Sequence, residues 1–216
     1  MRILVIAPHP DDETIGAGGT IARSIAEGDE VFLCIVTLAN LPPWSETIAE
    51  IQKKQVEEVR KIYGIKQVFF LGFPTVRLNT VPNMELTSAL QRVVDEVKPE
   101  IVYTSSACAI NQDHRLVFDA TLVATRPLPK SPVRRLLCYE IGPTVRFGNT
   151  AFVPNVYIDI SDFLDKKLEA MKCYKTELKE FPHPRSLEGL KLIAQERGLT
   201  IGLKAAECFQ LIREIR

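Results

Sequence analysis

Residues 1–13 read MRILVIAPHPDDE, an apolar run that stops at a histidine, two prolines and three consecutive acidic residues. The β-branched residues between positions 3 and 7 predict a buried strand, and a helix is expected from about Glu13. The polar residues therefore lie in a loop between a strand and a helix. In an open α/β sheet, loops at that position line the binding crevice.

The next part of the chain repeats this alternation of strand and helix. Amphipathic segments predict a helix between Ser45 and Gly64 and another that ends before Pro99. Four further apolar runs predict strands at residues 31–38, 68–71, 101–104 and 136–139. Such alternation is typical of a parallel sheet with right-handed crossovers. We therefore predict an α/β fold, Rossmann-like and doubly wound, with a mostly parallel sheet of strand order about 3-2-1-4-5 flanked by helices.

The pattern changes after residue 141, where a small C-terminal helical extension is predicted. Alternating apolar residues at 156–160 predict an edge strand, and Ser161 is expected to cap a helix that reaches Leu178. Two shorter helices are expected near residues 187–197 and 203–213.

The length of 216 residues, with no internal repeat or linker, favours one domain. We predict a single domain over residues 1–216, with its core at 1–141 and an edge strand and helices at 142–216. The content of 46% apolar and 25% charged residues excludes a disordered chain and a coiled coil.

The charge balance and the lengths of the apolar stretches indicate which binding partners and which cellular location to expect. Twenty-seven Lys plus Arg against 27 Asp plus Glu give a net charge of zero, so we expect no nucleic-acid partner and no membrane partner. No apolar stretch approaches the roughly 18 residues of a membrane span, and we expect a cytoplasmic protein. The five cysteines are scattered and read as reduced packing residues.

The residues that carry chemistry are two histidines, each with an acid beside it. His9 stands in the first loop with Asp12 three positions on, and His114 follows Asp113 just after the fourth predicted strand. The predicted strand order places the first and fourth strands side by side, so these loops meet. Two imidazoles and a carboxylate with open positions are typical of a catalytic zinc or ferrous site.

The chain resembles the LmbE-like, or PIG-L, family of zinc-dependent N-deacetylases, which act on substrates that contain N-acetylglucosamine. The similarity covers most of the sequence. It rests on the His-Pro-Asp-Asp-Glu motif at 9–13, Asp113-His114, Leu-Gly-Phe-Pro at 71–74, Pro-His-Pro-Arg-Ser at 182–186 and Arg197-Gly198.

The resemblance implies roles for His9, Asp11, Asp12 and His114. His9, Asp12 and His114 would bind one Zn²⁺ per chain, with Fe²⁺ or another divalent metal as the alternative, and Asp11 would be the general base. Asp113 would orient a histidine through its ring N–H. The reaction would remove an N-acetyl group from a small-molecule amino sugar or its conjugate and release acetate. Relatives often form homo-oligomers, including hexamers.

Some positions depart from the common pattern of the family. Asn111 stands where many relatives have a second histidine, and Asn cannot titrate. Our hypothesis is that His183, the only remaining histidine, takes over part of that role. Thr75 replaces a frequent Asp, and the expected arginine early in the second helix is replaced around Gln52, so the substrate's identity is not inherited.

Further residues are expected near the crevice. Glu140, at the end of the fifth predicted strand, could contact sugar hydroxyls, and Arg185 could meet a phosphate or a carboxylate on the substrate. Arg146 and Arg197 are candidates for the same role. The glycines at 16, 18 and 19 are interpreted as letting the first helix pack closely on the sheet, because no acid follows the second strand to hold a dinucleotide ribose.

Two rival hypotheses remain open. In the first, His9, Asp11 and His114 form a ferrous facial triad of an oxygenase, which predicts an all-β barrel. In the second, the protein binds sugars without catalysis and the metal site is structural, a hypothesis that Asn111 makes worth testing.

Overall fold

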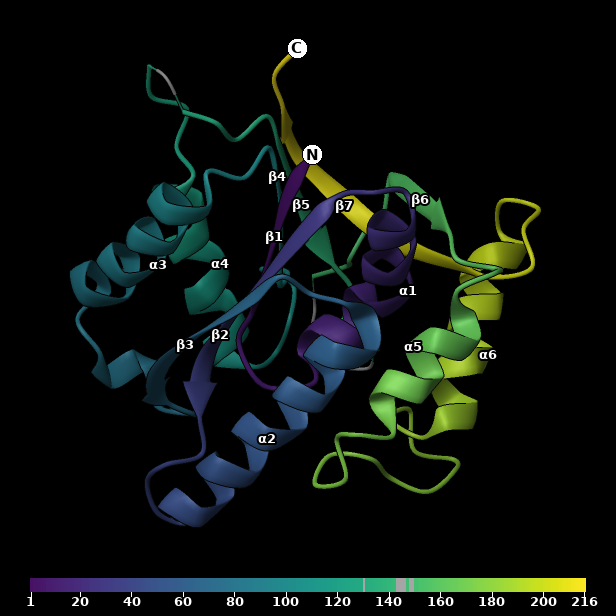
Figure 1. Ribbon diagram of the computed structural model, residues 1–216, viewed down its shortest axis with the longest axis horizontal. Coiled ribbons are helices and arrows are strands. Elements are labelled where there is room, and N and C mark those ends of the chain that lie inside the picture. The colour runs from purple at the N-terminus through teal and green to yellow at the C-terminus, as the bar shows by residue number, and fades with distance from the viewer. Residues whose placement is uncertain (130, 143–146, 148–149) are drawn as a thin grey trace.

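A computed structural model describes residues 1–129, 131–142, 147 and 150–216, and Figure 1 shows its central sheet with helices on both faces. The seven strands follow the order β3-β2-β1-β4-β5-β7-β6. The elements are β1 (Arg2–Ala7), α1 (Asp12–Ala26), β2 (Glu30–Leu38), α2 (Glu46–Tyr63), β3 (Gln67–Pro74), the 3-10 helix η1 (Leu78–Thr80), α3 (Asn83–Val97), β4 (Ile101–Thr104), α4 (Gln112–Ala124), β5 (Arg135–Tyr139), β6 (Val156–Asp159), α5 (Leu164–Met171), α6 (Leu187–Leu199) and β7 (Ala206–Glu214).

The strands β1 to β5 form the parallel part of the sheet, and the predicted order 3-2-1-4-5 is confirmed. Successive side chains of β1 enter different cores because strand side chains alternate between faces. Val5 packs in the core beneath α1 and α2, whereas Leu4 packs in the core beneath α3 and α4. Both faces of the sheet are therefore covered, as a doubly wound fold requires.

The helix α1 lies unusually close to the sheet, and its glycines explain why. A Cβ added to Gly16 would lie 2.8 Å from Cγ of Tyr139, and one added to Gly19 would lie 2.7 Å from Ile160. Real Cβ atoms do not approach other atoms so closely, so only glycine allows this packing. The predicted role is confirmed for Gly16, which faces β5, whereas Gly19 faces Ile160 just after β6 and Gly18 faces Tyr63 of α2 instead of the sheet.

The helix predicted near residues 203–213 is wrong, because this segment forms β7. The strand β7 runs antiparallel to both of its neighbours and lies between β5 and β6. Its charged residues are spaced like those on the polar face of an amphipathic helix, but Glu207 and Arg213 pair with groups elsewhere in the fold. Glu207 pairs with buried Lys167 at 2.6 Å, and Arg213 donates to the backbone carbonyl of Thr125.

The C-terminal extension is therefore part of the sheet as well as helical. The predicted edge strand is confirmed as β6, and the helix predicted near 187–197 is confirmed as α6. The helix expected after Ser161 is shorter than predicted, since α5 ends at Met171, and Ser161 Oγ donates to Asp159 at 2.6 Å instead of capping it. Among the described residues, no helix combines the length and apolar character needed to cross a bilayer.

Candidate active site

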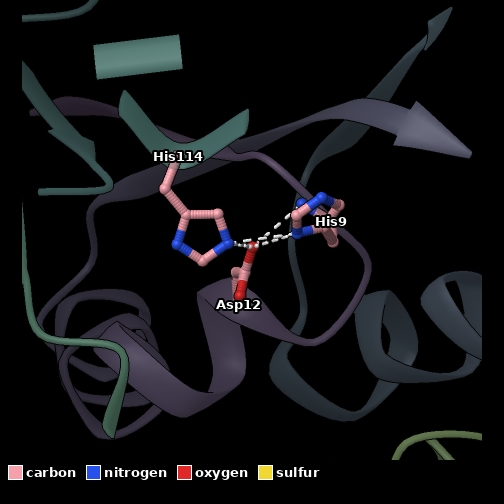
Figure 2. A group of neighbouring side chains, drawn as sticks. All are labelled: His9, Asp12 and His114. Carbon is pink, nitrogen blue, oxygen red and sulfur yellow. Dashed lines mark hydrogen bonds and ion pairs between the residues drawn. The ribbon is translucent and has the colours of Figure 1, made fainter. Parts of the chain in front are cut away.

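The candidate metal ligands converge where β1 and β4 end. His9 lies in the loop after β1, Asp12 is the first residue of α1, and His114 lies in the first turn of α4. Oδ2 of Asp12 is 3.2 Å from Nδ1 of His9 and 3.3 Å from Nε2 of His114. The two ring nitrogens are 3.1 Å apart, and Figure 2 shows all three atoms pointing to one place.

These spacings fit a divalent cation. Zinc binds nitrogen and oxygen ligands at about 2.0–2.2 Å, so the ligand atoms of a tetrahedral site lie about 3.3 Å apart. Within the described part of the chain, His9, Asp12 and His114 are the one group of three or more potential ligands with such spacing. Three protein ligands leave a further position for water or substrate, as catalytic sites require.

The electrostatics of the site also favour a positive charge. Burial opposes protonation of His9, but hydrogen bonds to Asp113 and Asp12 outweigh it and raise the pKa of His9 to about 10. Burial lowers the pKa of His114 to about 4, although Asp12 acts against this shift. The two carboxylates beside His9 thus favour a positive charge at this position, whereas burial disfavours a positive charge on His114.

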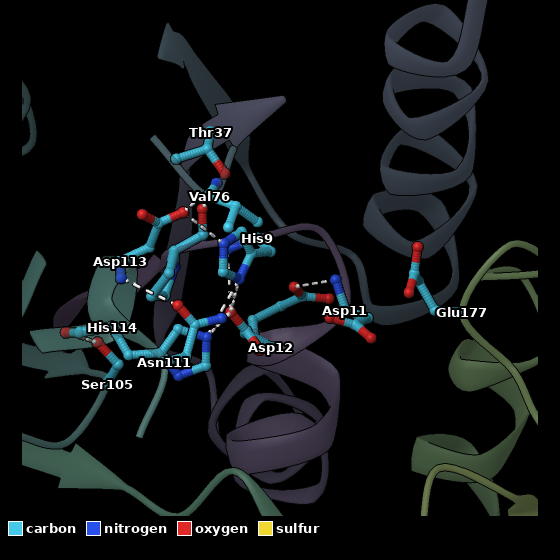
Figure 3. A network of polar contacts seen from close by, with 12 residues as sticks. His9, Asp11, Asp12, Thr37, Val76, Ser105, Asn111, Asp113, His114 and Glu177 are labelled. Carbon is cyan, nitrogen blue, oxygen red and sulfur yellow. Dashed lines mark hydrogen bonds and ion pairs between the residues drawn. The ribbon is translucent and has the colours of Figure 1, made fainter. Parts of the chain in front are cut away.

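Asp113 fixes the orientation of His9. Its Oδ2 lies 3.0 Å from Nε2 of His9 and accepts the N–H of Val76 at 2.5 Å, while Oδ1 accepts the N–H of Leu78 at 3.2 Å (Figure 3). A histidine that binds a metal through one nitrogen commonly donates the other N–H to a carboxylate. The contact leaves Nδ1 of His9 directed toward Asp12.

Asp11 places a second carboxylate beside the candidate metal ligands. Its φ of 109° lies in the left-handed region, which a non-glycine residue adopts only when its surroundings hold it there. Its side chain is buried and lies 3.4 Å from Nη1 of Arg185. Burial and the charge of Asp12 raise the pKa of Asp11 well above its usual range, while Arg185 opposes the shift.

Glu13, the third acid of the motif, supports the backbone of Asp11. Its carboxylate accepts the N–H of Asp11 at 3.3 Å and the hydroxyls of Thr14 and Tyr174, each at 2.6 Å. The sequence pattern assigns no role to Glu13 and does not indicate Tyr174. Tyr174 follows α5, so a residue of the C-terminal extension secures the loop after β1.

A pocket with a volume of about 290 Å³ opens above these side chains. Two of the expected substrate contacts, Asn111 and Arg185, lie in its wall. Oδ1 of Asn111 accepts the N–H of Asp113 at 2.9 Å and caps α4, and Nη1 of Arg185 lies 2.9 Å from Glu177. The remaining polar and aromatic lining includes Gln52, Thr75, Glu177 and Trp44, the only tryptophan.

The other two expected substrate contacts do not lie in the pocket wall. The carboxylate of Glu140 faces α6 and binds the guanidinium of Arg197 at 2.7 and 2.9 Å. His183 is exposed, and its Nδ1 accepts the backbone N–H of Arg185 at 3.0 Å. Arg197 is thus engaged in an internal ion pair, and Arg146 lies outside the described residues.

Glu177 and Trp44 were missed by sequence reasoning. Trp44 follows β2, so the same rule about strand ends that located His9 would have located it. Glu177 lies in the long loop between α5 and α6, where the sequence predicts the end of a helix, and it precedes the Pro-His-Pro-Arg-Ser motif at 182–186. No local sequence pattern predicts that its side chain reaches the pocket wall.

The sequence of the chain is similar to those of known proteins. The family model described as PIG-L, GlcNAc-PI de-N-acetylase, matches residues 4–125. A probable N-acetyl-alpha-D-glucosaminyl L-malate deacetylase 2 of Bacillus anthracis is 26% identical over 193 residues, which cover 82% of this chain and 81% of the relative.

Two solved structures extend the likeness to the whole chain. A conserved protein of Thermus thermophilus superposes with a TM-score of 0.79 at 29% identity, covering 99% of this chain and 96% of that one. A 4-carboxy-2-hydroxymuconate hydratase of Pseudomonas putida superposes with a TM-score of 0.78 at 18% identity, covering 100% and 97% of the two chains. The second match shows the fold alone, and this fold does not by itself decide the reaction. Because the family model matches more than half of the sequence, the chain belongs to the PIG-L, or LmbE-like, family.

Proposed function

We propose that the protein is a metal-dependent N-deacetylase that hydrolyses the acetamide of an amino sugar of the N-acetylglucosamine type, or of its conjugate. The observation that carries this proposal is the position of Asp11 beside the group of His9, Asp12 and His114, in one pocket. The names of the family model and of the Bacillus relative support the reaction, since both describe removal of an acetyl group.

His9, Asp12 and His114 are the proposed ligands of one divalent metal ion, for which zinc is the first choice and Fe²⁺ an alternative. When bound there, the metal supplies a Lewis acid that polarises the amide carbonyl and makes water more acidic. Asp113 is the proposed positioning residue, because its contact with His9 fixes which ring nitrogen faces the metal.

Asp11 is the proposed general base and acid. Its carboxylate takes a proton from the water that attacks the acetyl carbon, and it returns a proton to the nitrogen as the carbon–nitrogen bond breaks. The products are acetate and a free amine. The buried position of Asp11 suits this exchange, since burial brings the affinities of a carboxylate and an amine for the proton closer together.

Asn111 and Arg185 are the proposed substrate-binding residues within the pocket. Oδ1 of Asn111 is engaged at the start of α4, which leaves its Nδ2 as the donor that can stabilise the oxygen of the scissile amide. Arg185 lies against Asp11 and can hold it in place. Neither His183 nor Glu140 is part of this proposal, because neither lines the pocket.

We further propose that residues 1–216 act as one catalytic domain. The order of the strands supports this, because β7 lies between β5 and β6 in a single sheet. A cytoplasmic location and a homo-oligomer, hexameric by family resemblance, stay predictions.

The test measures acetate release from N-acetylglucosamine and a panel of its conjugates. Zinc-loaded protein is compared with chelated protein and with Asp11→Asn, which keeps the shape of the side chain but removes the base. We expect Asp11→Asn to lower turnover at least about 100-fold. Asp119→Asn, an exposed acid on α4, is the matched control and should retain activity. Release that persists without Asp11 or without metal would overturn the proposal.

The two rival functions make different predictions. A ferrous facial triad calls for an all-β barrel, whereas this chain has an α/β sheet, and Asp12 rather than Asp11 lies between the histidines. Oxygen consumption with ferrous iron and a 2-oxo acid would nonetheless support it. Tight binding of a sugar with no acetate released at any pH or with any metal would favour the non-catalytic protein.

A further inference from the structure

Val76 has a backbone conformation that its own side chain disfavours. Its φ of 58° lies in the left-handed region, where the branched Cβ of a valine crowds the following carbonyl oxygen. Among the described non-glycine residues, Asp11 and Lys98 also have a positive φ, and neither is β-branched. Strain of this kind persists only where the surroundings impose it, and it concentrates at active sites and ligand-binding positions. A functional reason for the valine is therefore expected.

The conformation is imposed by Asp113. Its carboxylate accepts the N–H of Val76 at 2.5 Å and the N–H of Leu78 at 3.2 Å. Leu78 is itself buried in the core beneath α3 and α4. Asp113 also contacts His9, so the turn at 75–78 cannot relax without releasing the carboxylate that orients a candidate metal ligand. The backbone at position 76 is therefore fixed by the site, whichever residue stands there.

A valine is not needed for this turn to form. Glycine would adopt the left-handed conformation without strain, and asparagine would adopt it with little. The hydrogen bond of Val76 to Asp113 uses only the backbone N–H, and the residue adds little to the core, since it is 60% exposed. What the valine adds is an isopropyl group in the wall of the pocket. The shape of the pocket is therefore the reason we assign to the strained residue.

Val76 lies beside the candidate metal ligands, on the side away from Asp11. Nε2 of His9 faces Asp113, which holds Val76, whereas Nδ1 of His9 faces Asp12, the neighbour of Asp11. Figure 3 likewise shows Val76 and Asp113 on one side of His9 and Asp11 on the other.

This placement orients the proposed substrate. Asp11 must return a proton to the amide nitrogen, so the nitrogen and the sugar that it carries face Asp11. In an amide, the nitrogen and the acyl chain lie on opposite sides of the carbonyl carbon. The acyl chain therefore faces Val76.

We propose that Val76 is a specificity-determining residue that limits the acyl group of the substrate to acetyl. This inference rests on the proposed function and deepens it, because it assigns one side chain to the acyl end of the substrate. The strain is retained because a branched side chain at this fixed position narrows the pocket next to the reacting carbon.

Three variants separate the size of the side chain from the strain of the backbone. Val76→Gly removes both, Val76→Asn removes most of the strain but keeps a side chain of similar size, and Val76→Ala shortens the side chain but keeps part of the strain. The substrates are the methyl glycosides of N-acetylglucosamine and N-butanoylglucosamine, with zinc-loaded protein. The ratio of kcat/KM for acetyl over butanoyl should fall at least about tenfold in Val76→Gly and less in Val76→Ala. In Val76→Asn it should stay within about threefold of the wild type.

Thermal stability should follow the backbone instead of the side chain. Val76→Gly and Val76→Asn should raise the melting temperature of the zinc-free protein by about 2–5 °C, and Val76→Ala should change it less. Lys98→Gly is the matched control, because Lys98 has a φ of 50°, follows α3, is exposed and does not line the pocket. It should also raise the melting temperature, but it should leave the acyl ratio unchanged. If the acyl ratio follows the melting temperature, or is equal in the wild type and all Val76 variants, the inference is wrong.

The binding of two hydroxamates separates this inference from the proposed reaction. Acetohydroxamate and butanohydroxamate bind zinc through the same two oxygens and differ only in the acyl chain, so their relative affinity reports the space at the acyl end without turnover. By calorimetry, zinc-loaded wild-type protein should bind acetohydroxamate at least about tenfold more tightly. Val76→Gly should lose this preference, and Lys98→Gly should keep it.

The two failures then look different. The expected hydroxamate preference, with no carboxylic acid released from any amide, would support the role of Val76 and overturn the reaction. Acetate release together with equal affinities of the wild type for the two hydroxamates would overturn the role of Val76 and leave the reaction standing.

Discussion

At the scale of single residues, the site depends on side chains that hold other side chains. Sequence reasoning could locate His9, Asp12 and His114, because the order of the strands fixes which loops meet. It could not locate the contact between Arg185 and Asp11, since Arg185 lies in a long loop whose path depends on tertiary packing. Glu140 and His183 do not line the pocket, because a residue close in sequence to the crevice need not contribute its side chain to the pocket wall.

Asp113 offers a direct test of such a supporting contact. Asp113→Asn should weaken zinc binding about 10- to 100-fold, because the amide is a poorer partner for the ring N–H of His9 than the carboxylate is. Competition with a chromophoric chelator measures the affinity. Asp119→Asn serves again as the control, and unchanged affinity in Asp113→Asn would show that His9 needs no such partner.

Tyr174 is the corresponding test for the loop that carries Asp11. Tyr174→Phe removes the hydroxyl that donates to buried Glu13 at 2.6 Å, and we expect it to lower the free energy of unfolding by about 1–3 kcal/mol. Urea unfolding gives this value. Tyr157→Phe, on a half-buried side chain of β6, should change stability less. Equal effects of the two substitutions would argue against a special role for Tyr174.

At the scale of helices and strands, the parallel half of the fold follows from local patterns and the extension does not. Buried parallel strands are continuous apolar runs, and helix ends are marked by Ser45 and Gly64, so α2 was predicted at its observed bounds. The strand β7 is different, because Glu207 and Arg213 interrupt its apolar residues. Those charges are matched by groups distant in sequence, and no local pattern reveals them.

The helix α1 gives a prediction with an unusual sign. Replacing glycine by alanine inside a helix normally stabilises it, but Gly16→Ala should destabilise this protein by about 1–3 kcal/mol. The added Cβ would lie 2.8 Å from Cγ of Tyr139, so the helix or the ring must move. Thermal or urea unfolding measures the change. Ser24→Ala, on the same helix, is the control, and stabilisation by Gly16→Ala would mean that α1 can shift outward without cost.

At the scale of the whole molecule, the candidate metal site joins the start of α1 to the start of α4 across the sheet. A ligand that binds only the folded state stabilises the entire fold, and a metal present at 1,000 times its dissociation constant contributes about 4 kcal/mol. Zinc should therefore raise the melting temperature of the wild-type protein, and a chelator should reverse the rise.

His9→Ala provides the control for this effect. It removes one of the three candidate ligands, so zinc should no longer raise its melting temperature, while the two apolar cores around Val5 and Leu4 remain intact. Differential scanning calorimetry with and without chelator gives both values. An equal rise in the wild type and in His9→Ala would place the metal elsewhere.

The position of β7 also has a consequence for how the chain comes together during translation. The ribosome delivers β6 before β7, so β6 has no neighbouring strand to pair with until later residues have emerged. The ion pair of Lys167 likewise cannot form until Glu207 has been synthesised. His9, Asp12 and His114 all belong to the part that is synthesised earlier, together with the parallel strands that bring them side by side. A nascent chain can therefore gather its candidate metal ligands before Arg185 has been synthesised, and the metal is expected to enter an open site that Arg185 and the start of α6 later enclose.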